Sequence, residues 1–112
     1  MKRNTYFCDI DGTIFKYRKF ETIPTHPPEV IESVSEQLKK WSEEGHHIVL
    51  TTARPEDLRE RTVFELDLHS IKYNQLVMNI GRGPRYLIND MDPEKEGNRA
   101  FGINLERDKG FD

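Results

Sequence analysis

Two short apolar runs without polar alternation constrain the fold of this chain more than any other feature. Residues 5–8 are Thr-Tyr-Phe-Cys, and residues 47–52 are His-Ile-Val-Leu-Thr-Thr. Runs of this kind are typical of strands that are covered on both faces, as in a parallel sheet. Parallel strands need a crossover connection, which is usually a helix. The two runs therefore predict a β-α-β unit.

The segment between the two runs has the period of an amphipathic helix. Ile31, Val34, Leu38 and Trp41 recur at i, i+3, i+7 and i+10, which places them on one face. Prolines precede these residues, and Gly45 follows them where a helix commonly ends. We expect one crossover helix here.

The remaining elements follow from local signals. Pro55 suits the first position of a second helix, which we expect to run to about Ser70. Short β-prone runs at 75–78, 86–89 and 101–104 predict three more strands. The order β-α-β-α-β-β-β predicts an α/β fold, namely a three-layer, Rossmann-like, mainly parallel sheet with helices on both faces.

Composition sets the scale of the protein. With 112 residues we expect a single domain at 1–112, and with 35% hydrophobic and 33% charged residues it is marginal alone, which makes a homo-oligomer plausible. Cys8 is the only cysteine, which excludes an intrachain disulfide and fits a reducing cytoplasm. No apolar window is long enough for a membrane span, and the net charge of −3 gives no general reason to bind nucleic acid.

Polar side chains follow three of the predicted strands at the point where each strand ends. They are Asp9 and Asp11, Thr51 and Thr52, and Asn89, Asp90 and Asp92. In such sheets the ligand crevice lies beyond the carboxyl ends of the strands. Gathered carboxylates repel one another, and a hard cation such as Mg²⁺ relieves that repulsion and leaves positions open for a phosphate oxygen. We therefore expect a magnesium site and a phosphate ester as substrate.

Three ordered motifs carry a resemblance to a known family. "DIDGT" at 9–13, "IVLTTAR" at 48–54 and "YLINDMD" at 86–92 resemble the motifs of the haloacid dehalogenase superfamily, over about residues 4–92. The portion "SIKYNQLVMN…GPRYLINDMDP…AFGINLERDKG" resembles small capless members found in capsule and polysaccharide biosynthesis. The resemblance implies a magnesium-dependent phosphatase acting on a small phosphorylated sugar or related metabolite.

The resemblance also assigns catalytic roles. Asp9 would attack phosphorus and form an aspartyl-phosphate, and Asp11 would act as general acid and then as base. Thr52 would donate a hydrogen bond to a phosphoryl oxygen. No lysine stands before the last acidic motif, so Arg82 is assigned the basic role, with Arg85 in reserve.

Metal and substrate contacts follow from the same motifs. The implied magnesium ligands are Asp9, the backbone carbonyl of Asp11, and Asp90, with Asp92 assisting through water. The predicted substrate-binding residues are Gly12, Thr13, Lys16, Arg18, Thr51, Ala53, Arg54 and Arg85.

Residues 14–27 leave room only for a short flap in place of a cap domain. Its basic residues, among them Lys16 and Arg18, predict either recognition of an anionic substrate or a solvated charged loop. The basic flap keeps a nucleic-acid end phosphatase as an alternative, which the net negative charge disfavours. A non-catalytic binding or scaffold module is the second alternative, because Asn89 stands where the family often has an aspartate.

Overall fold

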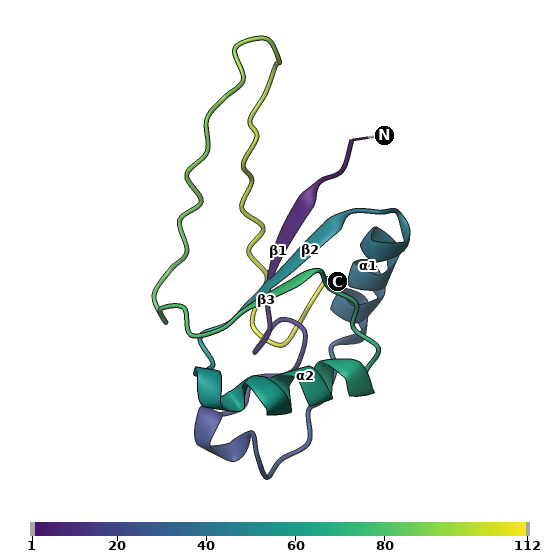
Figure 1. The fold of residues 1–112 in the computed structure, drawn as a ribbon, viewed down its shortest axis with the longest axis vertical. Coiled ribbons are helices and arrows are strands. Elements are labelled where there is room, and N and C mark those ends of the chain that lie inside the picture. The colour runs from purple at the N-terminus through teal and green to yellow at the C-terminus, as the bar shows by residue number, and fades with distance from the viewer. Residues whose placement is uncertain (1, 112) are drawn as a thin grey trace.

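Three parallel strands form the centre of the computed structural model, which describes residues 2–111 (Figure 1). Strands β1 (Thr5–Asp9), β2 (His47–Thr51) and β3 (Gln75–Val77) lie in the order β1-β2-β3. The register of β1 on β2 ends with Asp9 opposite Thr51. All three carboxyl ends therefore lie at one edge of the sheet, as predicted.

Two helices make the crossovers. Helix α1 (Glu32–Glu43) joins β1 to β2, and the 3₁₀ turn η2 (Glu56–Leu58) leads into α2 (Arg59–Leu68) before β3. Gly45 follows α1 with φ +88°, a conformation that costs glycine little and explains why the helix ends there. Both predicted helices are confirmed.

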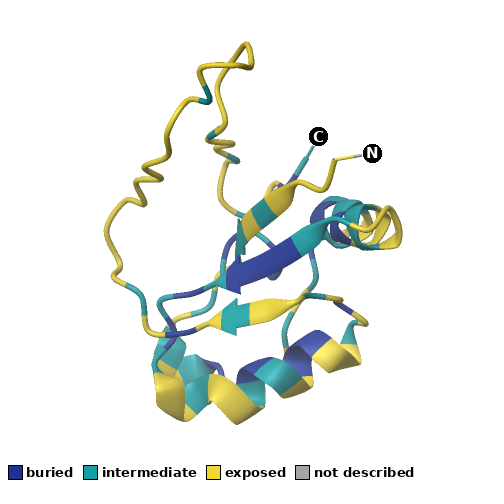
Figure 2. Cartoon of the chain, turned by 45° about the horizontal axis from the view of Figure 1, so that its top comes forward, coloured by how far each residue is buried: buried dark blue, intermediate teal, exposed yellow. Residues whose placement is uncertain are grey.

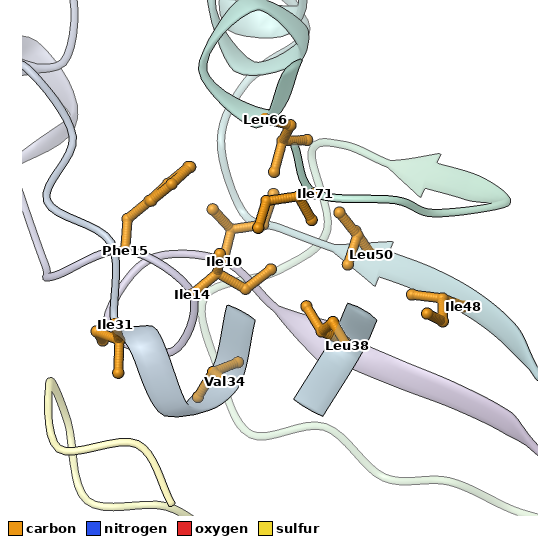
Figure 3. Packing of buried hydrophobic residues seen from close by; sticks show 10 residues of the cluster. All are labelled: Ile10, Ile14, Phe15, Ile31, Val34, Leu38, Ile48, Leu50, Leu66 and Ile71. Carbon is orange, nitrogen blue, oxygen red and sulfur yellow. The ribbon is translucent and has the colours of Figure 1, made fainter. Parts of the chain in front are cut away.

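One buried cluster joins the helices to the sheet (Figure 3). Leu38 of α1 and Leu66 of α2 belong to the same cluster as Leu50 of β2. Its other members come mostly from the loop after β1 and the start of α1: Ile10, Ile14, Phe15, Ile31, Val34, Ile48 and Ile71. A mainly parallel α/β sheet of the Rossmann type is thus confirmed.

Alternate residues of the strands project from the other face of the sheet. Phe7 and Val77 on that face are 57% and 41% exposed. The sequence predicted helices on both faces of the sheet. In the described residues, both helices pack on one face, the one that carries Ile48 and Leu50. No helix of residues 2–111 is long and apolar enough to cross a membrane.

The predictions of strands at 86–89 and 101–104 were wrong. Residues 81–104 form a two-legged projection, which we call the arm, and none of it is in a strand (Figure 1). A strand persists only where a neighbour accepts its backbone hydrogen bonds. Neither leg has such a neighbour within the described chain.

The segment expected as a flap, 14–27, lies under one end of α2. It contains one 3₁₀ turn, η1 (Phe20–Thr22), and Arg18 ties it to α2 through Glu65. The predicted single domain at 1–112 stays a prediction, and its first and last residues lie outside the described range.

Candidate active site

The loop that follows β1 is built as a tight turn anchored in the core. The Ile10 carbonyl accepts hydrogen bonds from the backbone N–H groups of Thr13, Ile14 and Phe15, while Ile10 and Ile14 are fully buried. Gly12 has φ +88°, which favours glycine. The apolar side chains thus hold the loop, and the carboxylates on either side of Ile10 are left at the strand edge.

Asp9 is the last residue of β1 and remains 41% exposed. The Thr13 hydroxyl donates to its Oδ2 at 3.3 Å, and Arg85 Nη2 lies 3.8 Å from its Oδ1. Partial burial raises the pKa of Asp9, the nearby Arg85 opposes this rise, and the Asp11 carboxylate adds to it. A carboxylate left partly desolvated and loosely paired suits attack on an electrophile or binding of a cation.

Asp11 is held differently from Asp9. Arg54 donates to both of its oxygens, from Nε to Oδ2 and from Nη2 to Oδ1, each at 2.9 Å. The Asp11 side chain is 8% exposed and that of Arg54 is fully buried. This two-pronged ion pair fixes the direction of the Asp11 carboxylate.

Arg54 is itself oriented by α2. Its Nη1 donates to the Thr62 hydroxyl at 2.9 Å and to Glu65 Oε1 at 3.2 Å. Glu65 is fully buried and also accepts two hydrogen bonds from Arg18 and one from Arg61. Burial by itself would raise the pKa of Glu65, but the arginines outweigh it and lower that pKa.

The two threonines at the end of β2 occupy different places. Thr52 is buried, its carbonyl accepts from Ile80 N–H, and it lines a small pocket with Asp9 and Asp11. Thr51 faces a larger groove along β1 instead. The geometry therefore places Thr52, and not Thr51, in the pocket with both aspartates.

Three arginines surround the small pocket, whose volume is about 160 Å³. Arg82 stacks over the Phe20 ring at 4.3 Å, Arg107 stacks over the Tyr17 ring at 4.2 Å, and Arg85 is the arginine nearest Asp9. Guanidinium groups stacked on rings are held in place without losing their charge. The pocket combines carboxylate, hydroxyl and cationic groups within a space suited to a small anion.

Several sequence-predicted residues are not in this pocket. Asp90 lies on the arm, 75% exposed, and pairs with Arg99 at 3.7 Å, while Asp92 pairs with Lys95 at 3.9 Å. Lys16 pairs with Glu29 on the surface. Arg18 and Arg54, expected to contact substrate, donate to Glu65 inside the protein. Gly12, Thr13 and Ala53 do lie at or beside the site.

Sequence reasoning missed two residues of the site. Arg107 lies in the run "AFGINLERDKG", to which no site role was assigned, and its place beside Gly12 in space identifies it, with the Asp108 N–H donating to the Gly12 carbonyl at 2.9 Å. Glu65 sits in a helix whose apolar residues are spread around the axis, so nothing in its spacing marks it as buried.

Magnesium is the cation that the donor chemistry favours. Asp9 offers a loosely paired carboxylate beside Asp11, and hard oxygen donors of this kind match Mg²⁺. Within residues 2–111, however, no three acidic, histidine or cysteine side chains gather closely enough to hold a metal. The loop after β1 therefore fits part of a magnesium site.

A parallel α/β sheet thus brings Asp9 at the end of its first strand, Asp11 in the loop that follows and Thr52 after its second strand into one pocket. The sequence model of the haloacid dehalogenase-like hydrolases matches residues 6–81, which is more than half of the chain. The chain belongs to this family. The match covers the sheet, both helices and the flap, and it ends where the arm begins.

Two solved structures resemble the chain. One is a chain in the structure of a Pnkp1/Rnl/Hen1 complex, with TM-score 0.62, 23% identity and coverage of 75% of this chain and 30% of that chain. The other is a crystal structure from Vibrio cholerae, with TM-score 0.59, 18% identity and coverage of 76% and 79%. At these identities the likeness concerns the fold. No curated protein matches the chain significantly.

Proposed function

We propose that the protein is a magnesium-dependent phosphatase that hydrolyses a phosphate monoester through an aspartyl-phosphate on Asp9. The observation that carries the proposal is the pocket itself, in which a partly exposed carboxylate faces a buried threonine and three arginines. Membership of the haloacid dehalogenase-like hydrolases supports the hydrolytic reaction. The phosphate ester, the metal and the intermediate are our proposal.

The proposed reaction begins with attack of an Asp9 oxygen on phosphorus. Thr13 orients that carboxylate by its hydrogen bond to Oδ2, and Thr52, which lines the same pocket, would donate its hydroxyl hydrogen to a phosphoryl oxygen. Arg82 and Arg85 stabilise the negative charge that spreads over the phosphoryl oxygens. Water then cleaves the acyl phosphate bond, releases phosphate and restores the Asp9 carboxylate.

Asp11 supplies the leaving-group proton in this scheme. Both of its oxygens accept hydrogen bonds from Arg54, which hold the carboxyl group in a fixed direction. In this scheme the hydrogen bond to the oxygen that carries the proton opens during the transfer. Magnesium, held by the Asp9 carboxylate and the Asp11 carbonyl, would neutralise charge between the nucleophile and the phosphate when bound.

The substrate we propose is a small phosphorylated sugar or related metabolite, such as those used in polysaccharide biosynthesis. The pocket beside Asp9, at about 160 Å³, is smaller than the ~300–1,000 Å³ that encloses a drug-sized ligand. It therefore takes the phosphoryl group, and the rest of the substrate lies outside, against the flap and the arginines.

Release of phosphate from a panel of monoesters tests the proposal. The panel contains p-nitrophenyl phosphate, sugar phosphates and a 5′- or 3′-phosphorylated oligonucleotide, with and without Mg²⁺. We expect Asp9→Asn to abolish release and Asp67→Asn, an exposed carboxylate on α2, to retain it. Equal release by wild type and Asp9→Asn would show that the nucleophile is wrong.

The same panel separates the alternatives. Preference for the oligonucleotide, with activity that falls steeply as salt rises, would identify a nucleic-acid end phosphatase instead. Phosphate binding without release from any monoester would favour the non-catalytic module.

A further inference from the structure

The arm is built of apolar legs and a charged tip. Six large apolar side chains on it are more than half exposed: Tyr86, Leu87, Ile88, Met91, Phe101 and Ile103. Five of its eight charged residues lie at the tip, between Asp92 and Arg99, and the other three, Arg82, Arg85 and Asp90, lie on the first leg. Figure 2 shows the whole arm coloured almost entirely as exposed. Monomeric proteins seldom leave so much contiguous apolar surface open to water.

The backbone of the arm is also unpartnered. Within residues 81–104 the single hydrogen bond between backbone groups is Lys95 N–H to the Asp92 carbonyl, at the tip. Two β-prone legs thus present free N–H and C=O groups over most of their length. Such groups pair with any strand edge that is free to accept them.

A free strand edge lies at β1. The Asn4 carbonyl accepts a hydrogen bond from His47 N–H, so the backbone groups of even-numbered residues of β1 face β2. Those of Thr5 and Phe7 face outward by alternation, and no described residue bonds to them. β1 is an edge strand that is open to pairing.

A groove of about 460 Å³ runs along this edge. Residues Tyr6 to Asp9 of β1 form one wall, and the other walls come from α1, the two roots of the arm and the C-terminal segment, including Leu38, Trp41, Pro84, Arg85, Ile103 and Phe111. The exposed Phe7 ring lines it. The groove therefore offers both hydrogen-bonding groups and apolar contact to an added strand.

The arm cannot easily fill this groove in its own chain. Asn79 and Ile80 are tied to the carboxyl edge of the sheet by hydrogen bonds to Arg54 and Thr52, and Arg85 lies at the same edge beside Asp9. A strand that begins at Tyr86 therefore runs away from that edge. Beside its own β1 it would be antiparallel and would carry Asp90 away from Asp9.

Parallel pairing of residues 86–89 with β1 of the same chain would strain the short segment that connects them to the sheet. Residues 81–85 reach at most about 18 Å when fully extended. The arm begins beside β3, three strand spacings from a new strand beyond β1, and these spacings combined with the length of a five-residue strand require about 20 Å in a straight line. A real path must rise over Phe7 and the other side chains of the sheet, and it must remove Arg85 from Asp9.

We propose that two copies of the chain exchange arms. Residues 86–89 of each copy add to β1 of the other as a parallel strand, with their carboxyl end beside Asp9, and a two-fold axis makes the exchange reciprocal. Each phosphoryl site then contains its own Asp9 and Arg85 together with Asp90 of the partner subunit. The exchange rests on the surface features alone, whereas the role of Asp90 as a metal ligand rests also on the proposed function.

Engineered disulfides test the exchange without reference to activity. In a Cys8→Ala background, Phe7→Cys is combined in turn with Leu87→Cys and Ile88→Cys, which covers both registers. We expect oxidation to give a covalent dimer for at least one pair on a non-reducing gel, and light scattering to give the dimer mass. Lys39→Cys on the exposed face of α1, combined with the same arm cysteines, is the matched control and stays monomeric on the gel.

Complementation tests the shared site. Asp9→Asn and Asp90→Asn chains are each expected to be inactive toward p-nitrophenyl phosphate with Mg²⁺. When the two variants are refolded together, half of the dimers contain one chain of each kind. Each mixed dimer has one site with both aspartates intact, so about a quarter of the wild-type activity returns.

The outcomes separate the exchange from the phosphatase proposal. A disulfide formed within one chain, or a monomeric mass with no disulfide for either pair, would overturn the exchange even if the wild type is an active phosphatase. A cross-linked dimer without complementation, where the wild type is active, would overturn the role of Asp90. A cross-linked dimer of an inactive wild type supports the exchange and counts against the proposed function alone.

Discussion

Glu65 is predicted to be the most sensitive charged residue of the fold. It is fully buried on α2 and accepts hydrogen bonds from Arg18, Arg54 and Arg61 at 2.7–3.2 Å. Glu65→Gln keeps the shape but removes the charge and presents an amide N–H group toward guanidinium donors. Breaking a buried ion pair in this way costs about 3–5 kcal/mol.

That loss is large for a domain whose total stability is about 5–15 kcal/mol. Urea unfolding at pH 7, followed by the fluorescence of Trp41, measures it. With an m value of about 1.5 kcal/mol/M, the midpoint should fall by about 2–3 M. Glu56→Gln is the control, since Glu56 pairs with Arg59 at 2.8 Å but on the surface, where solvent screens the pair, and its loss of stability should be much smaller.

The pH dependence adds a second check on Glu65. Its pKa is lowered on folding, so its contribution is complete above the ordinary carboxyl value of 4.5 and is lost as the pH falls through the folded-state value. The difference in the free energy of unfolding between wild type and Glu65→Gln should therefore be constant near neutral pH and become smaller in acid. Equal midpoints for Glu65→Gln and Glu56→Gln at pH 7 would refute the reasoning.

Three shorter predictions concern the pocket and its surroundings. Folding raises the pKa of Asp9, so its ionised form costs stability above that pKa. Asp9→Asn should therefore melt at a higher temperature than wild type at neutral pH without Mg²⁺, and the difference should close in acid. Burial, followed by the charge of Asp9, raises the pKa of the Cys8 thiol to about 12, so a thiol reagent at pH 8 should label the native protein at least ~100-fold more slowly than the urea-unfolded chain. Arg107→Gln should lower kcat/KM about tenfold on an active monoester, whereas Lys109→Gln, exposed and outside the pocket, leaves it unchanged. Fast labelling of Cys8 in the native protein would contradict the thiol prediction, and an Asp9→Asn variant less stable than wild type would contradict the Asp9 prediction. Equal losses of kcat/KM in Arg107→Gln and Lys109→Gln would contradict the Arg107 prediction.

Periodicity predicted the elements that are stabilised locally. The spacing of Val34 and Leu38 placed α1, and the unbroken apolar run at 47–52 placed β2, because burial of one face or both faces imposes those patterns. The carboxyl-edge rule likewise predicted that Asp9, Asp11 and Thr52 meet. These residues follow strands whose order the crossover helices fix.

The same reasoning could not predict which strand edge each run pairs with or which charged residues are buried. The runs at 86–89 and 101–104 have strand composition, but composition does not state which edge a strand joins or in which copy of the chain that edge lies. Arg54 was expected to meet substrate because it belongs to the motif "IVLTTAR". Its fully buried position beside Glu65 depends on where α2 packs, which the weak amphipathicity of that helix does not specify.

Arm exchange couples assembly to metal binding, and the coupling must run in both directions. If Asp90 of the partner subunit binds the same Mg²⁺ as Asp9, the dimer binds Mg²⁺ more tightly than the monomer, and Mg²⁺ must strengthen the dimer by the same factor. Sedimentation at a series of chain concentrations should therefore show dissociation at higher concentration without Mg²⁺ than with it. Asp90→Asn should keep the dimer, since the apolar legs and backbone still pair, but lose the dependence on Mg²⁺. A wild-type dimer equally stable with and without Mg²⁺ would separate assembly from the metal and leave Asp90 outside the site.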